Sequence, residues 1–259
     1  MLLAGKVRGM TLRKNIVITG ASSGLGEGMA RGFAAKGRNL GLCARRTDRL
    51  EKLAAELKAE YPGIEVVVHP LDVNDHDEVF KVFGEFRADL GTVDRVVVNA
   101  GLGKGQPVGK GRFDANKQTL ETNLVAGLAQ CEAAMQIFRD ERAGHLVVVS
   151  SFSALRGLPR NVTAYAASKA GLSALADGIR TDVHGTPIKV TTLLPGYIES
   201  EMNARAGGNL LVTKADAGAR ALVKAIESEP AKAYVPTLPW ALLSPVMRFA
   251  PPWLLRKFV

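Results

Sequence analysis

Short apolar runs recur along the chain and are separated by segments with helical spacing. The runs cover residues 15–19, 39–44, 65–70, 95–98, 145–149 and 188–194. Because they are continuous and do not alternate with polar residues, they predict strands that are buried on both faces. After the first run, apolar residues repeat at helical spacing through Met29 and Phe33. This alternation of strand and helix predicts an α/β fold with a parallel sheet covered by helices on both faces.

The length of 259 residues suits one α/β domain. No internal repeat or low-complexity linker divides the chain. We therefore expect a single-domain, Rossmann-type, doubly wound parallel sheet over residues 15–238. An N-terminal extension over residues 1–14 precedes it, and an apolar and basic C-terminal tail over residues 239–259 follows it.

The tail combines aromatic and basic residues. Trp240, Phe249 and Trp253 are interspersed with Arg248 and Arg256. Such a segment suits packing against a partner subunit, which we favour, but it also suits a membrane surface or the roof of a lipophilic pocket. The prolines that we expect to exclude one continuous helix are Pro245, Pro251 and Pro252.

Residues 114–139 have the spacing of one long helix. The residues expected on its buried face are Leu120, Leu124, Leu128 and Cys131. Asn123 interrupts this apolar stretch, and a buried amide needs hydrogen-bond partners.

A glycine-rich turn, Gly-Ala-Ser-Ser-Gly-Leu-Gly at residues 20–26, joins the first strand to the first helix. Glycines there permit a tight turn and close approach of the backbone to a pyrophosphate, which the helix N-terminus attracts. The residues expected to contact a dinucleotide are Gly20, Ser22, Ser23, Gly24, Leu25 and Gly26.

The ends of the next strands add expected cofactor contacts. Arg45 and Arg46 stand where an NAD site usually places an acid, so they favour the 2′-phosphate of NADP, unless they merely begin a charged helix. Asp72, beside Val73, either accepts a hydrogen bond from an adenine amine or caps the next helix. The contacts expected after the fourth strand are Asn99, Ala100 and Gly101.

Tyr165 and Lys169 lie four residues apart in a segment rich in small helix formers. On a helix this spacing places both side chains on one face, and a nearby ammonium lowers a phenol pKa from its usual value of about 10. The pair suits proton transfer, although the same spacing also occurs by chance on solvated helices.

Taken together and in this order, the motifs resemble the short-chain dehydrogenase/reductase family over essentially the whole chain. The matching residues are Thr19 to Gly26, Asn99-Ala100-Gly101, Asn123, Ser150-Ser151, Tyr165 to Lys169 and Pro195-Gly196. The resemblance implies NAD(P)H-dependent oxidoreduction of a carbonyl and alcohol pair.

The resemblance also implies roles for the catalytic residues. Tyr165 would exchange the proton with the substrate oxygen, and Ser151 would orient that oxygen. Lys169 would lower the tyrosine pKa and hold the nicotinamide ribose, and Asn123 would keep a water that connects the lysine to solvent.

Three serines compete for the orienting role. The interval between Ser151 and Tyr165 is one residue longer than usual in the family, which we attribute to the loop at residues 159–162. We favour Ser151, with Ser150 and Ser153 as alternatives.

The remaining cofactor contacts that the resemblance implies are Tyr165, Lys169, Pro195, Gly196, Ile198 and Ser200, the last two against the nicotinamide carboxamide. Residues 201–212 would form a substrate lid hinged at Gly207-Gly208. The residues that give this lid an apolar side are Met202, Leu210, Leu211 and Val212. The Tyr165 helix and the long helix before it would form the interface of a homodimer or homotetramer.

Composition narrows the partners and the compartment. A net charge of +9 and a pI near 9.7 favour anionic partners such as phosphorylated cofactors, acyl thioesters, acidic carrier proteins or anionic lipid. Nucleic acid is not expected, because acidic residues are interleaved with the basic ones and no nucleic-acid motif accompanies them.

Cys43, Cys131 and four scattered histidines match no metal or redox spacing, so no metal is expected. The chain shows neither the apolar run of a signal peptide nor one long enough to span a bilayer, and we expect a cytoplasmic protein.

The main hypothesis is therefore NADPH-dependent reduction of a carbonyl on an apolar substrate, such as a lipid-like ketone, a 3-oxoacyl thioester or a steroid-like ring. One alternative is an NADP-dependent alcohol or hydroxysteroid dehydrogenase that works oxidatively. Others are a non-catalytic NADPH-binding regulatory protein, and a protein that contacts lipid or a membrane surface through residues 239–259.

Overall fold

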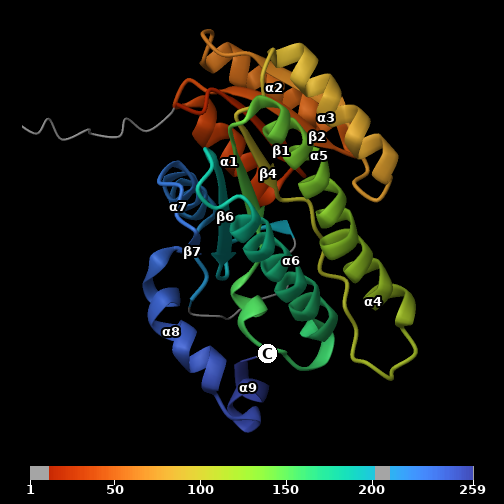
Figure 1. The fold of residues 1–259 in the computed structure, drawn as a ribbon. Coiled ribbons are helices and arrows are strands. Elements are labelled where there is room, and N and C mark those ends of the chain that lie inside the picture. Colours follow the sequence, from red (N-terminus) through yellow and green to blue (C-terminus); the bar gives the residue numbers. More distant parts are fainter. Residues whose placement is uncertain (1–11, 202–210, 259) are drawn as a thin grey trace, which may run out of the picture.

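A central parallel sheet covered by helices organises the computed structural model of the protein, which describes residues 12–201 and 211–258 (Figure 1). Its strands lie in the order β3-β2-β1-β4-β5-β6-β7, and every adjacent pair is parallel. The strands are β1 (Asn15–Thr19), β2 (Asn39–Ala44), β3 (Val66–Pro70), β4 (Arg95–Val98), β5 (Gly144–Val149), β6 (Ile188–Pro195) and β7 (Lys232–Val235). This confirms the predicted doubly wound Rossmann-type sheet.

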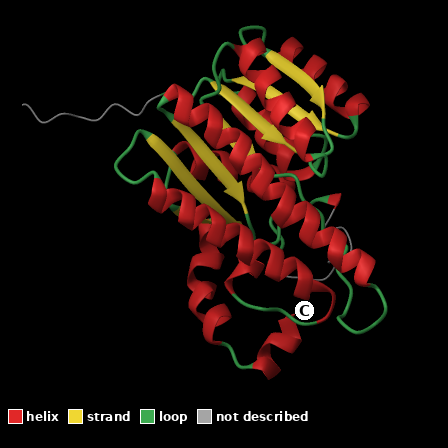
Figure 2. Cartoon of the chain, turned by 45° about the vertical axis from the view of Figure 1, so that its right-hand side comes forward, coloured by secondary structure: helices red, strands yellow, loops and turns green. Residues whose placement is uncertain are grey.

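Helices cover both faces of the sheet (Figure 2). One apolar cluster joins α1, α2 and α7 to one face, and a second joins α3, α5 and α6 to the other. The helices are α1 (Gly24–Ala34), α2 (Thr47–Glu60), α3 (His76–Leu90), α4 (Phe113–Leu120), α5 (Ala126–Glu141), α6 (Thr163–Asp182), α7 (Ala215–Glu227), α8 (Thr237–Phe249) and α9 (Pro252–Phe258). Shorter helical segments are the π-helix η1 (Glu121–Val125) and the 3-10 helices η2 (Phe152–Leu155) and η3 (Arg160–Val162).

The strand order reverses between β1 and β4, and the carboxyl ends of these strands are held together there. The Thr19 hydroxyl at the end of β1 accepts hydrogen bonds from the backbone N–H groups of Asn99 and Ala100, both at 3.0 Å. The Asn99 amide donates to the Thr19 carbonyl at 2.9 Å. Parallel sheets open a ligand crevice at such a reversal.

Two glycines of the turn after β1 have no room for a side chain. Gly20 has φ +65°, and a Cβ there would lie 2.9 Å from the Cα of Ala100. A Cβ on Gly26 would lie 2.3 Å from the Gly20 carbonyl oxygen and 2.8 Å from the Asn99 amide nitrogen. The turn therefore packs backbone against backbone, as the glycine pattern predicts.

Replacing Gly26 with Ala should destabilise the protein by about 1–3 kcal/mol, because the added methyl group clashes with backbone that cannot move freely. Gly84→Ala is the matched control. Gly84 lies in α3 with open space around its Cβ position, so alanine should stabilise the helix by about 0.5–1 kcal/mol. Chemical denaturation measures both changes, and equal stabilities for the two variants would contradict the packing described.

The segment predicted as one long helix is instead α4, η1 and α5 in succession. The five-residue π-helix η1 carries Asn123. Two residues predicted to be buried, Leu120 and Leu128, are exposed, while Cys131 is buried. Small residues occupy the inner face because α6 packs close: a Cβ on Gly127 would lie 2.9 Å from the Leu172 side chain.

The C-terminal region departs from expectation in two ways. The strand β7 at the sheet edge was not predicted, because it is short and only Val235 in it is fully buried. Pro245 lies inside α8 and does not interrupt it, so the break in the tail comes at Ala250 and Pro251, before α9 begins at Pro252. The tail is thus not one continuous helix, as predicted. Of the predicted N-terminal extension, residues 1–11 lie outside the described part.

Candidate active site

A cleft of about 940 Å³ opens at the carboxyl ends of the strands. Residues of the glycine turn line one end of it, and Tyr165 and Lys169 line its middle. Side chains from α8 line the other end, beside Phe152 of η2. The cleft therefore joins the predicted cofactor site to a mainly apolar chamber.

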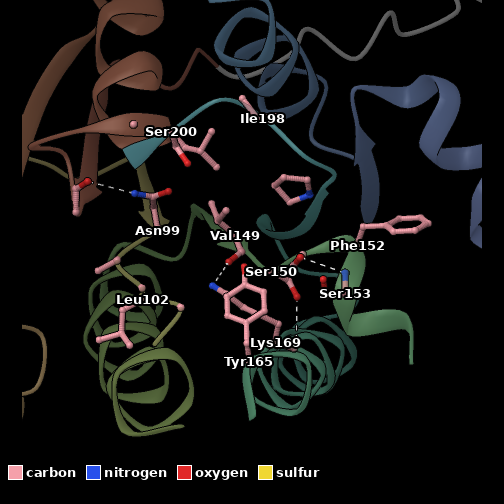
Figure 3. A pocket seen from close by; sticks show the side chains of 18 of the residues that line it. Asn99, Leu102, Val149, Ser150, Phe152, Ser153, Tyr165, Lys169, Ile198 and Ser200 are labelled. Carbon is pink, nitrogen blue, oxygen red and sulfur yellow. Dashed lines mark hydrogen bonds between the residues drawn. The ribbon is translucent and has the colours of Figure 1, made fainter. Parts of the chain in front are cut away.

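The helix α6 presents Tyr165 and Lys169 to this cleft on one face, as the four-residue spacing predicts (Figure 3). The Lys169 ammonium donates a hydrogen bond to the Val149 carbonyl at the end of β5, at 2.9 Å. Its nitrogen lies 6.0 Å from the centroid of the Tyr165 ring. The pair therefore lies together at the centre of the cleft.

The pKa of Tyr165 differs from the expectation. Burial raises it, and the nearby Tyr197 adds to the rise, while a hydrogen bond with the Ser151 hydroxyl lowers it. The contribution that opposes burial comes from Ser151, whereas Lys169, predicted to lower this pKa, donates its hydrogen bond to the Val149 carbonyl.

Burial also lowers the pKa of Lys169, from 10.5 to about 8. Between these two values the folded chain has released this proton while the unfolded chain still binds it, so this group makes the free energy of unfolding rise with pH. We expect the stability of the wild type relative to Lys169→Met to rise from pH 8 to 10.5. Denaturant titrations across this range measure it, with Lys189→Met, which removes an exposed lysine of β6, as the control. A stability difference that stays flat over the window would contradict the burial of the charge.

The three candidate serines have different surroundings. Ser150 donates to the Lys169 carbonyl at 2.8 Å and accepts from the Ser173 hydroxyl at 2.7 Å, so it holds β5 to α6. The Ser153 backbone N–H donates to the Ser151 hydroxyl oxygen at 3.1 Å. Ser151 is the serine of the three whose hydroxyl bonds with Tyr165. This supports Ser151 in the orienting role.

Asn123 is buried in η1 and its amide is fully engaged. It accepts from the backbone N–H of Leu102 at 2.8 Å and donates to the Leu102 carbonyl at 2.9 Å and to Ser168 at 3.1 Å. A Cβ on Gly101 would lie 2.9 Å from its oxygen and 3.4 Å from the Lys169 nitrogen. Asn123 thus fixes the loop after β4 beside the lysine, and π-helical turns often mark such functional positions.

Arg46 lies across the glycine turn at the far end of the cleft. Its guanidinium donates to the hydroxyls of Ser22 at 3.2 Å and Ser23 at 2.6 Å. Its third contact is the Glu201 carboxylate at 3.0 Å, which also pairs with Arg49 at 2.7 Å. The helix α2 begins at Thr47 with Arg46 as its N-cap residue, so Arg46 does begin a charged helix, and its side chain reaches back to the glycine turn. Sequence reasoning missed Glu201, because its contact with Arg46 joins segments far apart in the chain.

Arg45 and Asp72 are exposed at the same end, 3.8 Å apart. Asp72 accepts from the backbone and side chain of Asn74, and the cap of α3 is Asp75, so the capping alternative for Asp72 is wrong. Other predicted cofactor residues that line the cleft are Leu25, Val73, Ala100, Pro195, Gly196, Ile198 and Ser200. Leu211 of the predicted lid also lines it, whereas Met202, Gly207, Gly208 and Leu210 lie outside the described residues.

The sequence did not predict which residues form the apolar chamber. Trp240 of α8 is buried against Phe152, with ring centroids 4.8 Å apart, and against Tyr197, at 5.7 Å. Leu243 and Met247, one and two turns further along α8, line the same wall. The sequence left three locations for the tail: a partner subunit, a membrane surface or the roof of a pocket. In the structure, the inner face of the tail roofs the cleft.

Metal and membrane-spanning features are not seen in the described part of the chain. Residues 12–201 and 211–258 contain no group of three or more potential metal ligands of the His, Cys, Asp or Glu type. None of the helices within these ranges combines the length and apolarity needed to traverse a bilayer. Burial raises the pKa of both thiols, Cys43 and Cys131, which keeps them protonated and unreactive.

Comparison with known proteins decides the family. A family model described as short chain dehydrogenase matches residues 14–210. The chain belongs to the short-chain dehydrogenase family. An uncharacterized oxidoreductase of Mycobacterium tuberculosis is 54% identical over 246 residues, which cover 95% of this chain and 97% of that relative. Dehydrogenase/reductase SDR family member 7B of Bos taurus is 35% identical over 195 residues, covering 74% of this chain and 60% of that relative.

Solved structures show the same family fold. An alcohol dehydrogenase from Thermococcus sibiricus, complexed with 5-hydroxy-NADP, superposes with a TM-score of 0.76 at 30% identity over 85% of this chain and 95% of that chain. Levodione reductase shares the fold with a TM-score of 0.78 at 24% identity, over 86% of this chain and 95% of that chain. The protein is an oxidoreductase of this family.

Proposed function

We propose that the protein uses NADPH to reduce a carbonyl group on an apolar substrate, with Tyr165 as the proton donor. The observation that carries the proposal is the hydrogen bond of Tyr165 with Ser151 beside the buried Lys169. These three residues line the same cleft as Arg46. A phenol, a hydroxyl donor and an ammonium around one reacting oxygen are what carbonyl reduction needs from the protein.

The residues present fit a nicotinamide dinucleotide. Gly20 and Gly24, which line the cleft, and the N-terminus of α1 suit a pyrophosphate. Lys169 would hold the ribose and Asn123 would keep the loop beside it, with Ile198 and Ser200 on the nicotinamide side. When bound, this cofactor supplies the hydride, and the chain supplies the position and the proton.

Arg46 supports NADP(H) over NAD(H). It lies where a 2′-phosphate would meet its guanidinium and the hydroxyls of Ser22 and Ser23, with Arg45 next to it. A cation there favours a phosphate, whereas an NAD site uses an acid for the ribose hydroxyl. The Thermococcus enzyme, complexed with 5-hydroxy-NADP, is in line with this choice.

The wall of the chamber supports an apolar substrate. Trp240, Leu243, Met247, Phe152 and Leu158 all line the cleft, with Trp240 packed on Phe152. Ser151 and Tyr165 line the same cleft and supply the polar groups of the proposed reaction. A ketone with an apolar body and one carbonyl oxygen matches this distribution.

Exposed apolar residues on α4, η1 and α5 support a homodimer or homotetramer. Leu120, Val125 and Leu128 are 37%, 45% and 41% exposed. A second copy would cover them, and light scattering of the full chain measures this. We place the enzyme in the cytoplasm, on the sequence reasoning given above.

A panel of ketones and 3-oxoacyl thioesters of increasing apolar size, followed by NADPH absorbance, tests the function. We expect turnover that improves with apolar size. Parallel assays with NADP⁺ and the matching alcohols compare the oxidative direction. Tight NADPH binding without turnover in either direction would favour the regulatory alternative.

A further inference from the structure

The outer face of the C-terminal helices carries an exposed apolar stripe that the proposed reaction does not use. Its residues, with their exposed fractions, are Leu242 (73%), Val246 (47%), Phe249 (83%) and Trp253 (63%). The first three repeat at the spacing of one face of α8, and Trp253 is exposed near the start of the next helix, α9. We call these four residues the outer stripe.

The outer stripe is held rigidly by the other face of the same helices. Trp240 is buried against Phe152, and Leu255 and Ala250 are buried with Leu158 in a small apolar cluster. The Arg156 guanidinium donates to the carbonyls of Arg248 and Ala250 at the end of α8. The stripe is therefore not a loose segment whose apolar side chains can turn inward.

The two helices that carry the stripe contain basic residues and no Asp or Glu. No Asp or Glu occurs in residues 230–259 or 142–176, which include α8, α9 and the segment η2 that packs on α8. Arg160, Arg248 and Arg256 are exposed there. In Figure 1, α8 and α9 lie together at the end of the molecule away from α2 and α3.

We propose that the outer stripe docks the protein on an anionic lipid surface. Aromatic and aliphatic side chains flanked by arginines are the composition with which amphipathic helices lie in a membrane interface. Anionic headgroups complement the arginines that flank the stripe. A second copy is the poorer occupant, because a two-fold contact would set the arginines of each copy against those of the other.

Docking would bring the substrate chamber to the membrane. Val246 belongs both to the outer stripe and to the lining of the cleft, and Leu243 and Met247 on the next face of α8 continue that lining inward. The lipid surface would therefore lie beside the apolar end of the cleft. The binding itself does not depend on the proposed reaction.

Flotation of the full chain with vesicles tests the proposal without substrate. We expect the wild type to float with phosphatidylcholine vesicles that contain phosphatidylglycerol, and much less with phosphatidylcholine alone. Leu242→Ser/Phe249→Ser and, separately, Arg248→Glu/Arg256→Glu should each weaken partition by about tenfold or more. The matched control is Val108→Ser/Phe113→Ser, which removes two equally exposed apolar residues (73% and 78%) elsewhere and should float like the wild type.

Thermal melting and light scattering accompany the flotation. All variants should melt like the wild type, because every substituted side chain is exposed. A wild type that stays with the unbound fraction, or a control that loses as much binding as the stripe variants, would overturn the proposal. A lower molar mass for Leu242→Ser/Phe249→Ser would overturn it too, since the stripe would then be a subunit interface.

Discussion

Tyr165→Phe should lower kcat by about a hundredfold to ten-thousandfold, the usual contribution of a positioned general acid. The substitution removes the hydroxyl that bonds with Ser151 and keeps the ring in place. Because the proposed cofactor contacts of the glycine turn and Arg46 are untouched, NADPH affinity should stay nearly unchanged. Steady-state NADPH consumption with the best ketone of the panel gives kcat, and fluorescence titration gives the dissociation constant.

Tyr197→Phe is the matched control for this prediction. Tyr197 is the other phenol that lines the cleft, and its ring packs on Trp240. We expect this variant to keep most of its kcat, with any change falling on KM. If both variants lost activity equally, the loss would not identify Tyr165 as the proton donor, and this role would be wrong.

Arg46→Ala should weaken NADPH binding by about tenfold to a hundredfold, the equivalent of one charge-assisted contact of about 1.5–3 kcal/mol. NADH lacks the 2′-phosphate, so its dissociation constant should barely change. Fluorescence titrations with both cofactors measure the ratio of affinities directly.

Arg49→Ala separates this effect from a general loss of positive charge. Arg49 also pairs with Glu201, but within the described part of the chain its guanidinium does not hydrogen-bond to Ser22 or Ser23. Arg49→Ala should leave the ratio of the NADPH and NADH dissociation constants close to that of the wild type. An equal loss of NADPH and NADH affinity in Arg46→Ala would contradict recognition of the 2′-phosphate.

Local rules predicted much of the fold and the centre of the site. The strands β1, β2, β4, β5 and β6 are almost entirely buried, which leaves a clear apolar signal, whereas β3 at the sheet edge is only partly buried. The turn from Gly20 to Gly26 needs glycine because there is room for backbone atoms alone. Helix geometry places Tyr165 and Lys169 on one face. Each of these features depends on residues close together in the chain.

Features that depend on distant segments were the ones the sequence could not predict. Leu120 and Leu128 face outward because α6 packs closely on the inner face and selects small residues there, which helical spacing alone does not reveal. Glu201 reaches Arg46 from beyond β6. Trp240 reaches the cleft only because the chain turns back after β7.

The most direct test of the central claim is to follow deuterium from NADPH that is labelled at the transferable position of its nicotinamide. With a ketone from the panel, the wild type should yield an alcohol that carries one deuterium on the former carbonyl carbon. Tyr165→Phe should bind the same cofactor and give almost no labelled alcohol. Alcohol without deuterium, or labelled alcohol formed equally fast by Tyr165→Phe, would contradict carbonyl reduction by this site.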